Sequence, residues 1–184
     1  MDGKIWLDQI IVQFRKYKIY SERAAEQVAD DDFFSSMGGN PQSVATLMKH
    51  VGGNHRSRWR DFLTTDGEKS DRNRESEFSV DGETRQSIYQ KWEDGWQIAF
   101  DSLEKLTAAD LEKTITIRGE PMGVTDAIQR NLNHVAYHTG QIVHLARQLV
   151  GEKWQTLSIA VGKSDEFNRK MQSKFGDWWS KEKQ

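Results

Sequence analysis

Apolar residues recur in four stretches of the chain at the three-, four- and seven-residue steps of an amphipathic helix. This spacing gathers them on one helix face, because an α-helix turns once in about 3.6 residues. The pattern predicts long helices over residues 4–29, 43–62 and 83–106, and a fourth of about 26 residues between Thr125 and Gly151. Thr125 can cap the start of the fourth helix, and Gly151 stands where a left-handed glycine commonly ends one.

Two adjacent glycines, Gly52 and Gly53, interrupt the second predicted helix. Each costs about 1 kcal/mol relative to alanine in a helix interior. We therefore expect either a bend at this point or the close approach of another backbone.

The segments between the predicted helices differ in character. Residues 64–82 are densely charged, and their only apolar side chains are Phe78 and Val80, which is typical of a long connection over the protein surface. Residues 114–117 alternate polar and apolar side chains, and with residues 118–122 they predict a small hairpin or an extended loop. A short helix is predicted near residues 166–175.

Together these elements predict an all-α fold in a single domain over residues 1–184. The expected architecture is a four-helix bundle with a long charged connection between the second and third helices and a short C-terminal helix.

The composition narrows the chemistry open to the chain. It contains no cysteine, which excludes disulfide scaffolds, thiolate metal sites and cysteine nucleophiles. With 26 basic and 28 acidic side chains, its formal net charge of −2 provides no bulk attraction to a phosphate backbone, so we expect no nucleic-acid partner. The apolar runs are too short for a membrane span or a signal sequence, so we expect a soluble, cytoplasmic protein with no membrane partner.

Two histidines lie one helical turn apart in the fourth predicted helix. His134 and His138 share a face, so both imidazoles could reach one ion. His50 lies on a largely apolar face of the second predicted helix and could supply a third nitrogen. The alternative is that these are hydrogen-bonded core histidines. The pattern is neither H-E-x-x-H nor a di-iron set, because no glutamate stands directly after His134 or three residues before either histidine of the pair.

The segments Leu47–His50 and His134–Ile142 resemble the metal-site signature of the DinB/YfiT-like superfamily. Further segments resemble a bacterial branch of that superfamily, which is known mainly as a domain of unknown function. These segments are His50–Asn54, Arg58–Leu63, Thr64–Lys69 and Arg72–Phe78. The resemblance extends over about Ile5 to Phe175.

This resemblance implies a four-helix bundle that forms a homodimer and holds a divalent ion, zinc or nickel, through His50, His134 and His138. Characterised relatives include thiol-dependent transferases and isomerases that use bacillithiol or mycothiol, and metal-dependent hydrolases. We therefore expect a metal-dependent enzyme acting on a small molecule, as a bacillithiol-like thiol S-transferase or a hydrolase. The alternative is a non-catalytic bundle whose ion is structural or absent.

Two amides stand one turn from the predicted ligands, Gln141 after His138 and Asn54 after His50. Each could orient a bound water or a ligand imidazole, and hydrogen bonds between helices are an equal alternative. No carboxylate shares the face of His134 and His138 within one turn, so the sequence assigns no general base.

Five arginines could bind an anionic cosubstrate, namely Arg56, Arg58, Arg60, Arg72 and Arg74. They are interleaved with acidic residues, which favours a self-paired surface network instead.

Overall fold

The computed structural model describes residues 2–38 and 42–176. The chain consists of two compact units, residues 1–152 and 153–184. The prediction of one domain over residues 1–184 stays a prediction. All the predicted site residues lie in the larger unit.

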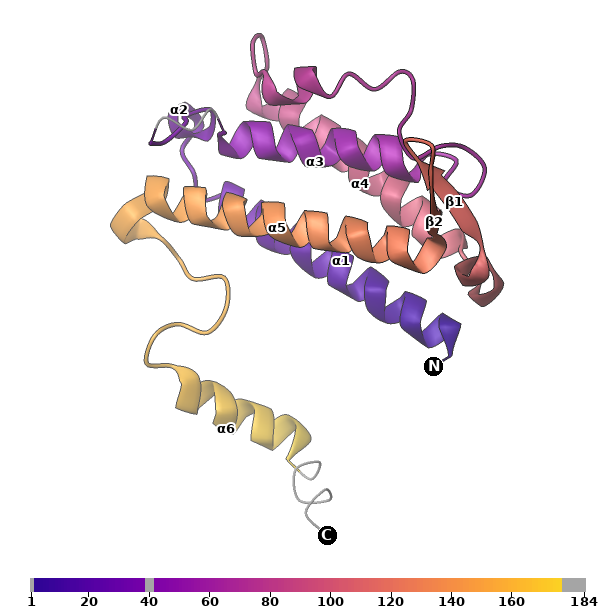
Figure 1. The fold of residues 1–184 in the computed structure, drawn as a ribbon. Coiled ribbons are helices and arrows are strands. Elements are labelled where there is room, and N and C mark those ends of the chain that lie inside the picture. The colour runs from indigo at the N-terminus through magenta and orange to yellow at the C-terminus, as the bar shows by residue number, and fades with distance from the viewer. Residues whose placement is uncertain (1, 39–41, 177–184) are drawn as a thin grey trace. The chain divides into compact units, whose positions relative to one another are not determined.

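The larger unit is mostly helical, with four long helices that lie side by side (Figure 1). These are α1 (Gly3–Ala25), α3 (Val44–Trp59), α4 (Arg85–Lys105) and α5 (Val124–Val150). Helix α3 packs against α4 and α5, and α1 packs against the same two helices, so the contacts close into a ring. A short helix, α2 (Asp30–Phe33), follows α1, and 3-10 turns occupy Glu75–Phe78, Ala108–Glu112 and Gly151–Lys153.

Hydroxyl side chains fix the starts of two long helices. Ser43 and Thr46 form a reciprocal capping box at α3, and Thr84 and Ser87 form another at α4. Each box satisfies backbone N–H groups that the first helical turn leaves without partners. The predicted Thr125 cap of α5 is wrong: the helix begins directly after a strand, at Val124, whose N–H donates to the carbonyl of Lys113.

Two helices end earlier than predicted. Helix α1 stops at Ala25 because the guanidinium group of Arg85 donates to the carbonyl oxygens of Ala25 and Val28 and so replaces the next turn. Helix α3 stops at Trp59 because Arg60 is extended and Asp61 adopts a φ of 50°. Helix α5 ends as predicted, at Gly151 with a positive φ of 61°.

Helices α3 and α4 approach each other at glycines. A Cβ atom on Gly52 would lie 2.5 Å from the carbonyl oxygen of Lys91, and one on Gly95 would overlap the Gly52 carbonyl group. The close approach expected for the glycine pair is therefore what the structure contains at Gly52.

The predicted hairpin is present. Strands β1 (Thr114–Ile117) and β2 (Glu120–Gly123) pair antiparallel, with Ile117 opposite Glu120. Within the described residues this is the one sheet, and it is a small addition to a mostly helical fold. The Asp66 carboxylate accepts the N–H groups of Arg118 and Gly119 at 2.8 Å each, so the hairpin tip is fastened to the long connection.

The core of the larger unit is rich in aromatic rings. Trp59, Trp92 and Trp96 are almost fully buried, and Phe14 makes edge contacts with Trp59 and Trp96 at centroid distances of 5.9 and 6.2 Å.

The smaller unit contains the predicted C-terminal helix, α6 (Ser164–Phe175). None of the helices among the described residues combines the length and the apolar character needed to cross a bilayer.

Candidate metal centre

Three histidines from two helices converge between α3 and α5. His50 comes from α3, and His134 and His138 come from consecutive turns of α5. The Nε2 atom of His134 lies 3.1 Å from that of His50 and 3.2 Å from that of His138. His50 and His138 are buried, and His134 is half-buried. The structure thus brings together the three residues that the sequence singled out, close enough to hold a metal ion.

The distances between these nitrogens match a shared ion. Imidazole nitrogens bind zinc at about 2.0–2.1 Å, so two of them on a tetrahedral ion stand about 3.3 Å apart. The two Nε2 separations of 3.1 and 3.2 Å are close to that value. Two of the three separations therefore fit a small divalent ion, and the ligand atoms of the three histidines all lie within 4.8 Å of one another.

The hydrogen bonds behind two of the rings set their tautomers. His50 Nδ1 contacts a Glu77 carboxylate oxygen at 2.7 Å, and His138 Nδ1 contacts the Gln141 amide oxygen at 2.7 Å. Both oxygens only accept, so each Nδ1 carries the proton and each Nε2 presents a lone pair. His134 can donate from its Nε2 to only one of the two. At least one buried lone pair is left, and a cation would satisfy it.

Gln141 is therefore placed against a predicted ligand, whereas Asn54 is not. Asn54 accepts a 2.9 Å hydrogen bond from the Asn131 side chain, whose own oxygen accepts from Trp59 Nε1 at 2.9 Å. Asn54 thus makes the helix-to-helix hydrogen bond, and it also lines the cavity that opens beside His50 and His134.

Glu77 is a site residue that the sequence did not predict. It lies 27 positions after His50, in the connection expected to run over the surface, yet only 5% of it is exposed. The expectation of a wholly superficial connection is wrong at this point. Gly53 makes room for the carboxylate, because a Cβ there would lie 2.5 Å from Glu77 Oε1. The neighbouring Phe78, an apolar residue in a charged segment, is the feature of the sequence that indicates burial here. Its ring stacks on the His50 ring at a centroid distance of 4.7 Å.

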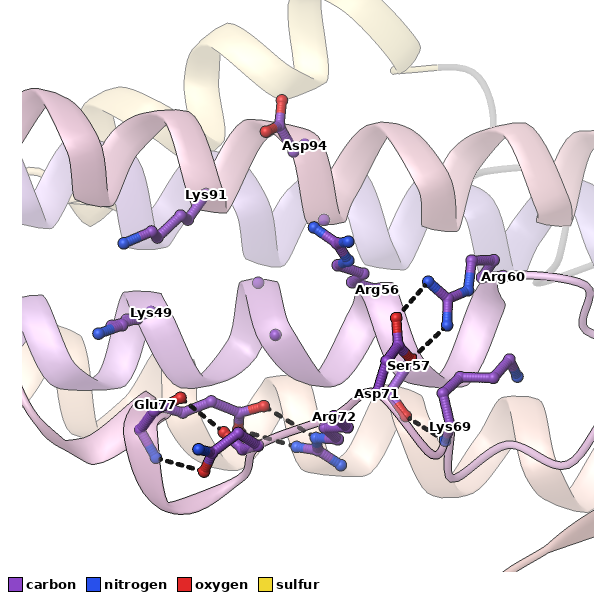
Figure 2. A pocket seen from close by; sticks show the side chains of 15 residues that line it. Lys49, Arg56, Ser57, Arg60, Lys69, Asp71, Arg72, Glu77, Lys91 and Asp94 are labelled. Atoms are coloured by element: carbon purple, nitrogen blue, oxygen red, sulfur yellow. Dashed lines mark hydrogen bonds and ion pairs between the residues drawn. The ribbon is translucent and has the colours of Figure 1, made fainter.

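Arg72 holds the Glu77 carboxylate from the other side. Its Nε and Nη2 atoms donate to the two carboxylate oxygens at 2.8 and 2.9 Å (Figure 2). Burial favours a higher pKa for the Glu77 carboxyl, but the hydrogen bonds from His50 and Arg72 outweigh it and hold the pKa below its ordinary value. The carboxylate is consequently ionised and accepts from His50.

Burial keeps the paired histidines neutral. It lowers the pKa of His138 to about 4, with a further contribution from His50. Burial also lowers the pKa of His134, and the neighbouring His138 and His50 rings reinforce the effect. Neutral imidazoles are the form that binds metal ions.

The other two histidines point elsewhere, as their spacing predicted. His55 is completely buried against Phe14 and Trp96. His144 is exposed on α5.

A cavity of about 240 Å³ opens beside His50 and His134. Among the described residues, no fourth histidine or carboxylate joins the group of three. The histidine centre is therefore open on one side, which is the arrangement of a site that leaves a coordination position for a water or a substrate.

The arginines at the end of α3 and in the long connection differ in whether they form ion pairs. Arg58 pairs with Glu68 at 2.8 Å, Arg60 with Asp71, and Arg72 with Glu77. In the described part of the chain Arg56 forms no ion pair, and it lines a second cavity of about 300 Å³ that contains none of the three histidines (Figure 2).

A model of the family described as "Protein of unknown function (DUF1572)" matches residues 2–163 of the chain. The predicted resemblance to a domain family of unknown function is thereby confirmed. Neither the curated proteins nor the solved structures include a match.

Proposed function

We propose that this chain, which belongs to the DUF1572 family of proteins of unknown function, is a divalent-metal-dependent enzyme that acts on a small molecule. The observation that carries the proposal is the set of three convergent Nε2 atoms, which is open to a cavity on one side. The reaction class is thiol S-transfer or hydrolysis, and the ion is zinc or nickel.

The fold supports a place in the DinB/YfiT-like superfamily. The four long helices contact one another in a closed ring, as the helices of a four-helix bundle do. From the superfamily assignment we also expect a homodimer and a cytoplasmic location. Sedimentation at micromolar concentration tests the dimer.

The residues of the chain have separable tasks in this proposal. His50, His134 and His138 would hold the ion, and Glu77 and Gln141 orient two of the rings through their Nδ1 atoms. A divalent ion at this position supplies a Lewis acid that lowers the pKa of a coordinated water or thiol. The chain has no thiol of its own, so a thiol nucleophile must come with the substrate. Glu77 is occupied by His50 and Arg72, which leaves it poorly suited to act as a general base.

An open coordination position separates this proposal from a non-catalytic bundle. A structural zinc site closes its fourth position with a protein ligand. The open cavity beside His50 and His134 favours the enzyme.

The test is a screen of zinc- and nickel-loaded protein for thiol transfer to electrophiles and for hydrolysis of esters and amides. The screen compares the wild-type chain with His138→Ala and with His144→Ala, an exposed histidine on the same helix. We expect an activity that His138→Ala abolishes and His144→Ala preserves. An equal rate in the His138→Ala variant would contradict the proposal.

A further inference from the structure

The cavity beside the histidines has an unusual lining. Besides His50 and His134, it contains five arginines from four parts of the chain and, within the described residues, no acidic side chain. The arginines are Arg58 from α3, Arg72 and Arg74 from the connection, Arg118 from the hairpin tip and Arg130 from α5. Such a lining is strongly positive where the proposed ion would add further positive charge.

Three of the arginines share one acidic partner. Arg58, Arg72 and Arg118 approach the same oxygen, Glu68 Oε2, at 2.8, 3.2 and 3.4 Å. Arg72 also binds Glu77, which is itself shared with His50. One carboxylate oxygen cannot balance three guanidinium groups, so these arginines retain donors for a further anion.

The other two arginines are almost without acidic partners. Arg130 forms no ion pair in the described part of the chain. Arg74 makes a pair with its exposed neighbour Glu75 at 3.5 Å, and such surface pairs contribute little. Two guanidinium groups at the cavity are thus available to a ligand.

The hairpin turn determines the backbone conformation of Arg118. Its φ of 58° lies in the left-handed region, which disfavours a long side chain by about 1 kcal/mol and which asparagine or glycine tolerates better. The two N–H bonds to Asp66 hold the residue in this conformation. A two-residue hairpin loop requires positive φ at both positions, and Gly119 has a φ of 77°, so the turn itself fixes this backbone and places Arg118 at the cavity.

We propose that this cavity binds an oxyanion group, a carboxylate or a phosphate, of the small molecule that reacts at the metal centre. The substrate is then an anionic molecule whose charged group contacts Arg118 and Arg130 while its reactive atom faces the histidines. That the bound anion is a substrate rests on the proposed function. The oxyanion site itself depends only on the arginines.

Calorimetric titration of metal-free protein tests the site, with inorganic phosphate as one probe and malonate as the other. We expect at least one probe to bind, and its identity separates a phosphate site from a carboxylate site. Arg130→Gln and Arg118→Asn should each weaken that binding about tenfold or more. Arg147→Gln, an exposed arginine elsewhere on α5, should change it less than about twofold.

Two further measurements locate the site and guard against misfolding. Arg118→Asn should keep or raise the melting temperature while it weakens binding, since asparagine relieves the backbone strain. Arg56→Gln, in the second cavity, should leave binding unchanged. Absence of binding of both anions, full affinity in Arg130→Gln, or a loss confined to Arg56→Gln would overturn the proposal.

The same samples keep this inference distinct from the proposed function. His138 does not line the cavity, so His138→Ala should lose the metal and retain the anion. Arginine-dependent anion binding in a chain that takes up no metal would refute the metal enzyme and leave the oxyanion site standing. Metal uptake without anion binding would refute the oxyanion site and leave the metal enzyme standing.

Discussion

His50 and Glu77 form a buried hydrogen bond of 2.7 Å that joins helix α3 to the long charged connection. The bond fixes the proton on Nδ1 of His50 and turns the Nε2 lone pair toward the other two histidines. It also explains why a charged segment is drawn into the protein at this one point. The pair thus couples the position of the connection to the geometry of the candidate metal centre.

Replacing the carboxylate should weaken metal binding without removing a ligand. We expect Glu77→Gln to lower zinc affinity about 10- to 100-fold, because a neutral amide polarises the imidazole less than a carboxylate does. Competition with a chromophoric chelator measures the affinity. Glu75→Gln, an exposed carboxylate two residues away, is the matched control and should bind as the wild type does. Equal zinc affinities in all three proteins would show that Glu77 does not contribute to metal binding.

Asn54 should matter for stability and not for the metal. Asn54→Ala leaves a buried N–H of Asn131 without its acceptor, so we expect the free energy of unfolding to fall by about 1–3 kcal/mol. Denaturant titration measures this loss. A metal affinity reduced as much as in Glu77→Gln would show instead that Asn54 acts on the ion.

The glycine contact between α3 and α4 should tolerate no side chain. Gly95→Ala forces a methyl group into the Gly52 carbonyl, and we expect a loss of about 2 kcal/mol or more in the free energy of unfolding. Gly140→Ala, on α5 with no atom within 4 Å of the added methyl, should instead gain about 1 kcal/mol. Similar effects of the two substitutions, measured by thermal unfolding, would disprove the close approach.

His55 should make the fold sensitive to acid. Burial lowers the pKa of His55 to about 3, with a smaller contribution from His50, whereas an unfolded histidine titrates near 6.5. Its folded pKa is depressed, so the unfolded state binds the proton first. Stability is full above about pH 6.5 and falls as the pH drops toward 3.

The matched comparison for this acid sensitivity is His55→Phe. Between pH 7.5 and 5.5 the wild type should lose about 1.4 kcal/mol more than the variant in the free energy of unfolding. Identical losses in the two proteins, measured by urea titration at each pH, would show that His55 does not titrate in this way.

The sequence predicts those features that depend on neighbours along the chain. The spacing of His134 and His138 places both on one face of α5 because they belong to one helix, and the hairpin follows from the alternation in residues 114–117. The position of His50 opposite them depends on how α3 packs against α5. Spacing alone left that open, and the family resemblance supplied it.

The features that the sequence did not predict arise from contacts between distant segments. The early end of α1 depends on Arg85, which lies 60 residues after the carbonyl of Ala25. Glu77 reaches His50 only because Gly53 makes room for it. In a segment crowded with acidic residues, no local pattern distinguishes the one carboxylate that is buried.

Elemental analysis of the untagged protein, purified without chelators, tests the central claim most directly. We expect about one zinc or nickel ion per chain, and its loss in a His134→Ala/His138→Ala variant that remains folded. Protein that holds no metal, even after incubation with zinc and nickel, would contradict a metal centre and make the three histidines core residues.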